Sequence, residues 1–553
     1  MITILFRYPT VEHEMGSDTT FIHSMANSII RDGNAIWILH PSSYFGLYAL
    51  SYPSALPFIL AGGSEASGMP VEGIMLVTGI IFAIAGVLCA YIVAKLIRDD
   101  DLFAYLMALL FILAPFLVKD TTWVASSRGY VVALSPFLLL LLIKHMRTRD
   151  LRYLVLSLAT FIVMAATHRM GTLAILVLIA YIFAIPLHLV TQRLRFSLVS
   201  LEKPMRFIIV LSALFAFLGV FYVQFHFPGI SGANVVQQYS GGAFFKGSEF
   251  HVLLINMAVS FLARVCLLLP LSLVGLVAYV WKRPKESYDK FLLLTILLFL
   301  PLLSMRDYIV EFLTLLLVLL AIIGLISIAR AFRDRRRTMT FVLAVVIVSS
   351  VGFSWTMKDY WRRAYPTDGP IQTSVYDAAL YIKEMSWGTT VSNSGLTGGR
   401  IAAISRMPNM PLGGASTHGF SAQQLIWGYV KPEELRVRLL DLTTVSLDTD
   451  EIYVPVGLPN AEVDWETMLY YSSPLMADYE MDRYDVHFVI ADNDIFPMFL
   501  SYGVLRISCL FGDDPVSHGD PYKFCTTTSD VLPTNRYITF SNSYLTIWLA
   551  RGG

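Results

Sequence analysis

Repeated apolar runs, each close to the length needed to cross a bilayer, restrict this chain to the folds of a membrane protein. A straight helical span needs about 20 residues. The hydrophobic fraction is 56% and the charged fraction 15%, whereas soluble domains average about 45–50% and about 25%. We therefore predict a polytopic α-helical protein with about ten spans, over 73–96, 102–118, 130–145, 152–167, 172–190, 206–226, 262–281, 290–305, 310–330 and 339–356.

Basic residues gather in alternate loops between these runs, and this pattern predicts the topology. Loops rich in Lys and Arg stay on the cytoplasmic side of a membrane. The basic loops hold Lys95 and Arg98; Arg147, Arg149 and Arg152; Arg193, Arg195, Lys203 and Arg206; Lys282, Arg283 and Lys285; and Arg330, Arg333, Arg335, Arg336 and Arg337. The other loops and everything after residue 356 then face outward, in a multi-pass protein of the cell membrane.

Residues 1–70 come before the first predicted span and face outward in this topology. An outward segment of this length normally follows a membrane span that starts it. Either the tail is translocated on its own, or a first helix is missing from the chain, and ITILF near the start would be the end of such a helix. The sequence leaves both alternatives open. We treat 1–70 as a first outer loop, 71–356 as the membrane domain and 357–553 as a soluble domain.

The polar stretch 12–57 contains the carboxylate that we consider first for chemistry, Asp18, with Glu14 four residues before it. Apolar residues after Asp18 recur at helical spacing over 19–31, which predicts an amphipathic helix. This helix is too short and polar to span a bilayer, so we expect it to lie at the membrane surface. A structural explanation also exists, because Ser17 or Asp18 is a natural N-cap for this helix.

An apolar run over 250–281 is too long for one span and contains Arg264. An arginine at the bilayer centre costs roughly 2.5–3.5 kcal/mol on insertion scales. We therefore divide the run into an interfacial or re-entrant helix over 250–261 and a span that begins near Phe261. This division places Arg264 at the outer boundary of the membrane.

Residues 357–553 differ in composition from the apolar region, and we predict an extracytoplasmic mixed α/β domain there. The segments 486–491 and 537–540 are typical of short strands, and 377–385 of a helix. The domain also holds Cys509 and Cys525, which would form a disulfide if it faces an oxidising compartment. Cys89 and Cys266 lie in apolar runs and are expected to be packing residues.

Several outward-facing polar groups complete the candidate site. They are His23 beside Asp18, Tyr52 before the first span, Asp120 and Arg128, His168 and Arg169, and Arg306 with Tyr308. Arginine binds phosphate with a planar fork of donors, and a carboxylate can deprotonate a hydroxyl or hold a divalent cation such as Mg²⁺ or Mn²⁺. Carboxylates and arginines on one membrane face therefore suit an anionic, lipid-linked substrate.

Each of these groups also has an explanation without chemistry. Arg128 and Arg306 flank spans, where arginine often extends to the lipid headgroups. His168 in a tight turn can be a packed interfacial histidine. Lys and Arg number 41, as do Asp and Glu, so the chain has no net charge that would indicate a nucleic-acid partner.

Two stretches resemble the GT-C glycosyltransferases, polytopic enzymes that use polyprenyl-phosphate-linked sugars and include protein mannosyltransferases and oligosaccharyltransferase catalytic subunits. GSDTTFIHSMANSIIRDG, followed by SYPSALP, is similar to their acidic first outer loop with surface helices. MRDYIVEFLTLLLVLLAIIGL, residues 305–325, resembles the Arg-x-Tyr opening of a late family helix whose arginine reaches the lipid phosphate. Residues 376–412 resemble the start of the outer domain in archaeal members.

This resemblance implies an inverting hexosyl or pentosyl transferase that glycosylates a cell-envelope acceptor on the outer membrane face. Asp18 would be general base or metal ligand, with Glu14 beside it. Arg306, Arg128, Arg264 and Arg169 would hold the donor phosphate, and His23, His168, Asp120, Tyr308 and Tyr52 would line the cavity. Two departures are a missing first span and a missing Trp-Trp-Asp signature, where 391–395 reads VSNSG. The missing signature favours transfer of a single sugar over transfer of a whole oligosaccharide.

Two other classes of protein remain open at this stage. A transporter or lipid flippase often shows internal repeats and charged residues inside its spans, and we find no repeat here. A non-catalytic membrane scaffold with an outer binding domain would not need its arginines near Asp18. The sugar, the polyprenol, the acceptor and the oligomeric state are not predicted.

Overall fold

The computed structural model of the chain describes the larger part of the 553 residues. The described residues are 1–38, 41–47, 51–193, 264–266, 268–281, 285–300, 302, 307–331, 335–364, 369–385, 388–392, 395–410, 482, 485–492, 506–509, 525–528, 538–541 and 545–549. The predicted span 206–226 and the predicted interfacial helix 250–261 lie outside these residues, as does Arg306.

The chain divides into two compact units. Unit 1 comprises Met1–Pro9 and Met75–Tyr365, and unit 2 comprises Thr10–Ile74 and Pro366–Gly553. Most of residues 1–70 group with the C-terminal residues in unit 2. The division into an outer loop, a membrane domain and a soluble domain stays a prediction.

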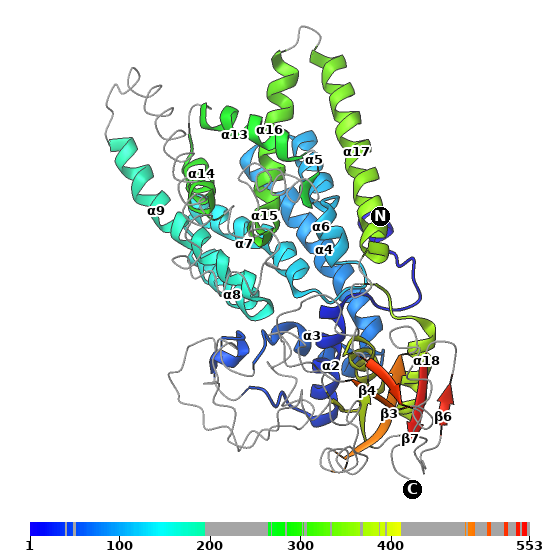
Figure 1. The fold of residues 1–553 in the computed structure, drawn as a ribbon. Helices are drawn as coiled ribbons and strands as arrows, with labels where there is room; N and C mark the ends of the chain where they lie inside the picture. Colours follow the sequence, from blue (N-terminus) through cyan, green and yellow to red (C-terminus); the bar gives the residue numbers. More distant parts are fainter. Residues whose placement is uncertain are drawn as a thin grey trace. The chain divides into compact units, whose positions relative to one another are not determined.

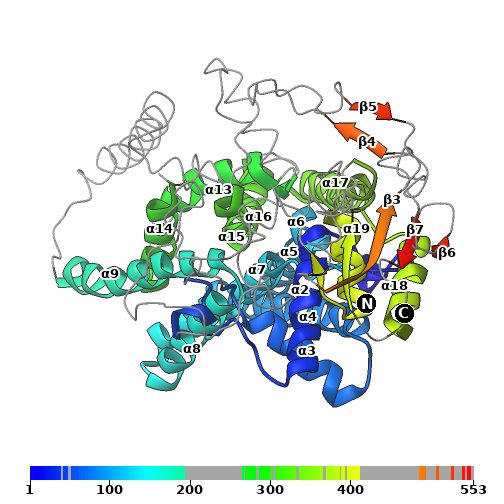
Figure 2. The ribbon, with the colours of Figure 1, turned by 60° about the horizontal axis from the view of Figure 1, so that its bottom comes forward.

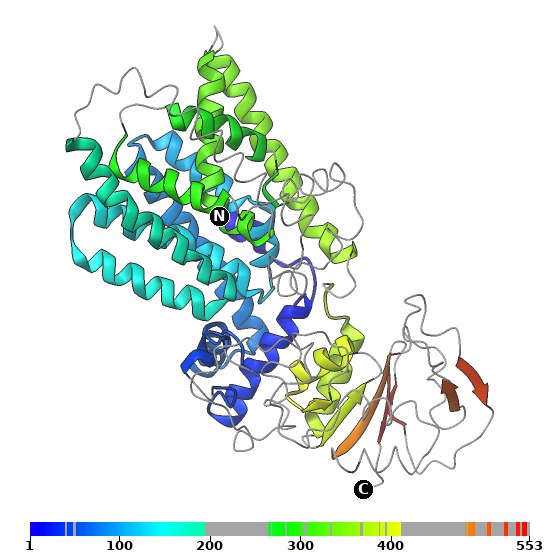
Figure 3. The ribbon, with the colours of Figure 1, turned by 60° about the vertical axis from the view of Figure 1, so that its left-hand side comes forward.

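Unit 1 is helical, and Figure 3 shows its cyan and green helices running side by side. The long helices α16 and α17 form a hairpin (Figure 1). The helices of the unit are α1 (Ile2–Arg7), α4 (Val71–Ile97, whose first turn belongs to unit 2), α5 (Asp101–Ile112), α6 (Pro115–Asp120), α7 (Ser127–Thr148), α8 (Leu151–Thr167), the 3₁₀ helix η2 (Arg169–Leu173), α9 (Ala174–Arg193), α13 (Leu268–Trp281), α14 (Ser287–Phe299), α15 (Asp307–Phe312), α16 (Thr314–Ala331) and α17 (Arg335–Ala364).

Three helices of the described part are long and apolar enough to cross a membrane: Val71–Ile97, Ser127–Thr148 and Arg169–Val190. Shorter apolar helices are Asp101–Ile112, Leu151–Thr167, Leu268–Trp281, Thr314–Ile328 and Thr340–Thr356. Each of them overlaps a predicted span. The total of about ten spans stays a prediction.

A proline explains one difference between the helices and the predicted spans. The span expected over 102–118 is broken, because α5 ends at Ile112 and Pro115 opens α6. Proline has no backbone N–H and its ring clashes with the preceding turn, so a helix begins at it more readily than it continues through it. Within the span expected to begin near Phe261, the structure describes residues 264–266 and then α13, which begins at Leu268.

Close backbone packing holds α13 against α16. A Cβ atom added to Gly275 would lie 1.7 Å from the carbonyl oxygen of Leu320, and one added to Gly324 would lie 2.2 Å from that of Leu271. Only glycine allows two helices to approach this closely.

Inside α7, Pro136 leaves the Val132 carbonyl without its usual donor, and the Ser135 hydroxyl donates to it instead at 2.8 Å.

In unit 2 the helix α2 (Ser17–Asp32) packs against α3 (Ala55–Ser67) and α19 (Gly395–Ser405). The predicted helix 19–31 is confirmed, but its expected surface position is not. Ile22, Met25 and Ala26 on its apolar face are fully buried within the protein. The short helix η1 (Pro41–Tyr44) and α18 (Thr373–Met385) complete the described helices of the unit, and α18 confirms the helix expected over 377–385.

A five-stranded sheet of unit 2 has the order β2-β1-β3-β7-β6. Its strands are β1 (Thr389–Ser392), β2 (Asn409–Met410), β3 (Val486–Asp492), β6 (Ile538–Ser541) and β7 (Leu545–Leu549). β1 runs parallel to β2 and β3, whereas β3–β7 and β7–β6 are antiparallel. Figure 2 shows α18 and α19 beside these strands. The strands expected over 486–491 and 537–540 are confirmed as β3 and β6.

A second, two-stranded antiparallel sheet pairs β4 (Arg506–Cys509) with β5 (Cys525–Thr528). In its register Cys509 lies directly opposite Cys525. Directly opposed residues of antiparallel strands have Cα atoms about 4.5–5.5 Å apart. A disulfide needs about 4.4–6.8 Å between these atoms, so the register suits one.

We accordingly predict a Cys509–Cys525 disulfide in protein whose unit 2 has matured in an oxidising compartment. Peptide mapping after alkylation without reduction should recover one cross-linked pair containing both residues. Cys89 and Cys266, which are free thiols in the structure, serve as the internal control and should be recovered as separate alkylated peptides. Separate alkylation of Cys509 and Cys525 as well would contradict the prediction.

Candidate active site

The residues expected at the site divide between the two units. Asp18, Glu14, His23 and Tyr52 belong to unit 2, and Asp120, Arg128, His168, Arg169, Arg264 and Tyr308 belong to unit 1. The structure brings several of them together within each unit. Each set forms a cluster of its own, which is described separately below.

Asp18 lies in the first turn of α2 and its side chain is partly exposed. The expectation that Ser17 or Asp18 caps this helix is wrong. The N-cap is Gly16, with φ 93° and ψ 143°, a conformation that favours glycine, and no side chain caps the helix. Asp18 therefore has no capping role, and its negative charge lies at the positive end of the helix dipole.

Glu14 and His23 form a buried pair next to Asp18 in the sequence. The Nδ1 atom of His23 lies 2.9 Å from Oε1 and 2.8 Å from Oε2 of Glu14, and the two residues are 5% and 1% exposed. Buried polar groups of this kind are costly unless they are hydrogen-bonded to one another. Glu14 and His23 thus support the loop around Asp18 from inside the protein.

Three residues that the sequence analysis did not select extend this pair into a cluster. Glu72 accepts a hydrogen bond from the Glu14 backbone N–H at 2.9 Å, and His13 Nδ1 lies 3.4 Å from Glu72 Oε1. The ring of His13 stacks on that of Tyr376, with centroids 3.7 Å apart. The sequence signal that could have identified Glu72 is its position as a carboxylate in the first turn of an apolar helix.

Burial raises the pKa of the Tyr376 hydroxyl, and the charges of Glu72 and Glu14 and a hydrogen bond to Glu72 raise it further. Each of these influences disfavours the phenolate, because a phenolate near two carboxylates is repelled. Tyr376 therefore stays protonated and acts as a neutral partner of Glu72.

Backbone contacts attach the acidic loop to the segment before α18. Met15 and Pro370 form an antiparallel bridge, the N–H of Ile371 donates to the Glu14 carbonyl at 3.1 Å, and that of Gly16 to the Gly369 carbonyl at 3.5 Å. All of these residues belong to unit 2. The N-terminus of α2, which carries Asp18, is therefore fixed by C-terminal residues.

Tyr52, also in unit 2, packs edge-on against Phe21 of α2 at 5.0 Å between ring centroids.

In unit 1, Arg128 and two aromatic rings lie together. The Arg128 guanidinium is 5.4 Å from the centre of the Tyr308 ring, a cation–π distance. The His168 ring packs edge-on against the Tyr308 ring, with 6.0 Å between the ring centroids. His168 also caps η2, because its Nδ1 accepts from the Met170 N–H at 2.9 Å. Arg169 opens η2 and is partly exposed.

Asp120 is connected to Arg128 through a serine. Arg128 Nε donates to Ser126 Oγ at 3.3 Å, and Ser126 Oγ donates to Asp120 Oδ2 at 3.3 Å. Asp120 is 1% exposed, so it orients this network from inside and leaves the partly exposed Arg128 as the outer group.

Arg264 pairs with a buried glutamate that the sequence analysis overlooked. Its Nε donates to Oε1 of Glu311 at 3.0 Å, and Glu311 is 2% exposed whereas the Arg264 side chain is 21% exposed. Oε2 of Glu311 has no hydrogen-bond partner among the described residues. A glutamate three residues after Tyr308 in an apolar helix is the sequence signal for this position.

No group of three or more His, Cys, Asp or Glu side chains in the described ranges is arranged to hold a metal ion. Glu14 directs both of its oxygens at His23, which is hydrogen bonding and not the spread of ligands that a cation needs. The described residues thus do not fit the divalent-cation site that the sequence suggested around Asp18.

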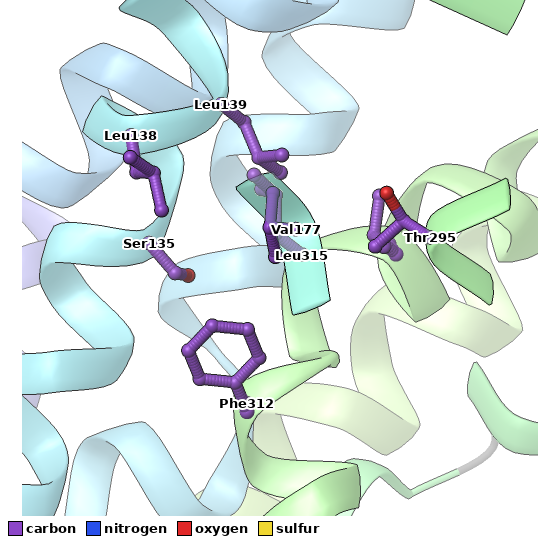
Figure 4. A pocket seen from close by; sticks show the side chains of 8 residues that line it. Ser135, Leu138, Leu139, Val177, Thr295, Phe312 and Leu315 are labelled. Atoms are coloured by element: carbon purple, nitrogen blue, oxygen red, sulfur yellow. The ribbon is translucent and has the colours of Figure 1, made fainter. Parts of the chain in front are cut away.

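Figure 4 shows a pocket inside unit 1 lined by Ser135, Leu138, Leu139, Val177, Thr295, Phe312, Leu315 and Leu316. The hydroxyls of Ser135 and Thr295 donate to carbonyls of their own helices, at 2.8 and 2.9 Å. The remaining lining is apolar. It therefore offers no charged group to a phosphate, and the charged clusters are the better candidates for a polar substrate.

No family model and no curated protein matches the sequence, but solved structures resemble the fold. The Archaeoglobus fulgidus oligosaccharyltransferase in complex with zinc and sulfate has a TM-score of 0.53 and 11% identity, over 89% of this chain and 68% of that one. Archaeoglobus fulgidus AglB, in complex with an inhibitory peptide and a dolichol-phosphate, has a TM-score of 0.52 and 11% identity, over 89% and 69%. The mycobacterial arabinofuranosyltransferase AftD has a TM-score of 0.50 and 14% identity, over 100% of this chain and 41% of that one.

These likenesses, at sequence identities of 11–14%, show that the chain shares a fold with the solved oligosaccharyltransferases and with the arabinofuranosyltransferase. This fold agrees with the GT-C superfamily expected from the sequence, and membership in that superfamily stays a prediction.

We predict that His23→Phe destabilises unit 2, because it removes the hydrogen-bond partner of the buried Glu14 carboxylate. The expected loss is about 1–3 kcal/mol, seen as a lower midpoint of thermal unfolding in detergent. Glu12→Gln is the matched control, since Glu12 is exposed and contacts Thr373 at the surface. An unchanged midpoint for His23→Phe would show that the pair contributes nothing.

A second prediction concerns alkaline stability. Because the pKa of Tyr376 is raised on folding, the folded protein keeps a proton that the unfolded chain releases above its pKa of about 10. The contribution of Tyr376 is complete below about pH 10 and is lost as the pH rises further. Tyr376→Phe should lose less thermal stability than wild type when both are compared between about pH 9 and about pH 11. Equal losses would rule out this titration.

Proposed function

We propose that this chain is a membrane glycosyltransferase that moves a sugar from a polyprenyl-phosphate-linked donor to an acceptor on the outer face of the membrane. The observation that carries the proposal is the fold likeness, which extends over 89% of the chain to oligosaccharyltransferases and over all of it to an arabinofuranosyltransferase. One of these neighbours holds a dolichol-phosphate. A multi-pass location in the cell membrane, with unit 2 outside the cytoplasm, belongs to the same proposal.

In this proposal the donor phosphate binds at the basic and aromatic cluster of unit 1. Arg128 and Arg264 are partly exposed, and each is supported from behind by a buried carboxylate network. Guanidinium groups bind phosphate oxygens with parallel hydrogen bonds. Arg169 and Arg306 would contribute to the same site, with His168 and Tyr308 beside them.

Asp18 is the proposed general base. Its carboxylate would accept the proton of the acceptor hydroxyl while that oxygen attacks the anomeric carbon of the sugar. The bond between that carbon and the phosphate oxygen breaks, and the lipid phosphate leaves with the electron pair. Arginines at the phosphate stabilise the charge that develops on it. Attack opposite the leaving group inverts the anomeric configuration.

Glu14 and His23 would position this base without touching the substrate, because both are buried below it. The described residues do not fit a divalent cation, so no step of the proposal passes through one. Transfer assayed with and without EDTA reports directly on any metal requirement. Tyr52 would line the acceptor side of unit 2, beside Phe21.

A single hexosyl or pentosyl unit is the proposed cargo, because residues 391–395 lack the Trp-Trp-Asp sequence. Unit 2 would select the acceptor, which can be a glycan, a lipid or a protein of the cell envelope. The fold likeness to transferases favours this proposal over a transporter, a flippase or a scaffold.

The test is sugar transfer by the purified protein from a panel of polyprenyl-phosphate sugars. Asp18→Asn should lower turnover by about 100-fold or more, because general base catalysis contributes about 10²–10⁴. The donor Kd should change little, since Asp18 is not assigned to the phosphate.

Asp32→Asn is the control for this substitution, because it removes the same charge at the opposite end of α2, where Asp32 pairs with Arg31. It should transfer like the wild type. Full activity in Asp18→Asn would eliminate Asp18 as the base. Absence of both transfer and donor hydrolysis with every lipid would remove the glycosyltransferase proposal itself.

A further inference from the structure

Glu311 is a buried carboxylate that the proposed reaction does not use. It lies in α15, three residues after Tyr308, and accepts a hydrogen bond from Arg264 Nε at 3.0 Å. Burial disfavours the ionised form of Glu311, whereas the Arg264 guanidinium at this distance favours it, as in a buried ion pair. The ionised Glu311 of this pair places its negative charge directly behind a proposed phosphate-binding arginine.

The negative charge of Glu311 determines how much negative charge on a bound anion the arginines can neutralise. Arg128 and Arg264 supply two positive charges, and both act electrostatically on Glu311. Glu311 supplies one negative charge, which leaves a surplus of one positive charge in this trio. Asp120, linked to Arg128 through Ser126, adds a further negative charge on the buried side, so the four groups carry no net charge with Glu311 and one positive charge without it.

Burial makes the influence of Glu311 stronger than that of a surface carboxylate. Its side chain is 3% exposed, so water does not screen it well. Oε2 has no hydrogen-bond donor among the residues that the structure describes. Its negative charge is therefore directed mainly at the neighbouring arginines and at any anion that they bind.

We infer that Glu311 is a specificity-determining residue, which limits the positive charge of the Arg128–Arg264 site so that it prefers lipid donors with one phosphate over donors with two. The inference rests on the proposed function. A polyprenyl phosphodiester of a sugar carries one negative charge at neutral pH, whereas the corresponding diphosphate carries two. Glu311 does not touch the donor but acts through the arginines, and the second charge of a diphosphate would face it without compensation.

The experiment compares two matched probes, farnesyl phosphoryl-mannose and farnesyl diphosphoryl-mannose, by their Kd for the full-length protein in detergent. The wild type should bind the monophosphate probe more tightly. Glu311→Gln removes the charge and keeps a hydrogen-bond acceptor for Arg264. It should bind both probes more tightly, with the larger gain for the diphosphate, and shift their Kd ratio by about tenfold.

A purely structural role for Glu311 predicts a different result. If Glu311 only held Arg264 in place, Glu311→Gln would weaken both probes equally, and that outcome would overturn the inference. An unchanged ratio would overturn it as well. Glu311→Met is the second variant, because it removes the same charge without introducing a buried amide, and it must shift the ratio in the same direction.

Glu286→Gln is the matched control in unit 1. Glu286 caps α14, where glutamine retains the hydrogen-bond acceptor, so the variant changes the total charge equally and should keep the wild-type ratio. A shift as large in Glu286→Gln would attribute the effect to net charge and overturn the inference. Failure of the wild type to bind either probe would instead refute the proposed donor site. Binding with an unaltered ratio in the Glu311 variants refutes only the role of Glu311.

Discussion

Charge that is removed from water must be compensated nearby, and this requirement governs both polar clusters of the molecule. A buried carboxylate without a partner is costly, so breaking a buried pair destabilises the folded protein. Glu14 meets the requirement with His23 in unit 2, and Glu311 meets it with Arg264 in unit 1. In each unit a buried glutamate thereby supports a more exposed charged residue, Asp18 in one case and Arg264 in the other.

This arrangement separates the groups that can meet a substrate from those that hold them. Asp18, Arg128 and Arg264 are partly exposed, whereas Glu14 and Asp120 are almost completely buried. A reactive group needs a fixed position more than it needs many contacts, because small displacements reduce the rate strongly. The backbone bridge between Met15 and Pro370 provides such fixation for the start of α2.

Much of this fold was predictable, and the failures have physical causes. Apolar runs close to the length of a span predicted the long apolar helices, and short runs rich in β-branched and aromatic residues predicted β3 and β6. The grouping of 10–74 with the C-terminal residues could not be predicted, since it depends on contacts such as Ile371 to Glu14 between distant segments. The structural alternative, in which Ser17 or Asp18 caps α2, was wrong because Gly16 takes the N-cap position. Glu311 and Glu72 were overlooked because a single acid in an apolar helix has no distinctive spacing, and only its neighbours identify its role.

The discontinuity of unit 2 has a consequence for how the protein is made. Residues 10–74 leave the ribosome before α5 to α17 of unit 1, and their partners 369–371 follow only after the last of these helices. Until then the buried Asn27 side chain of α2 lacks its later partner, the Ala403 carbonyl of α19, to which its amide donates. The contacts that attach residues 10–74 to the C-terminal part of unit 2 can therefore form only late in synthesis. A chain that stalls before residue 369 would leave α2 without any of them.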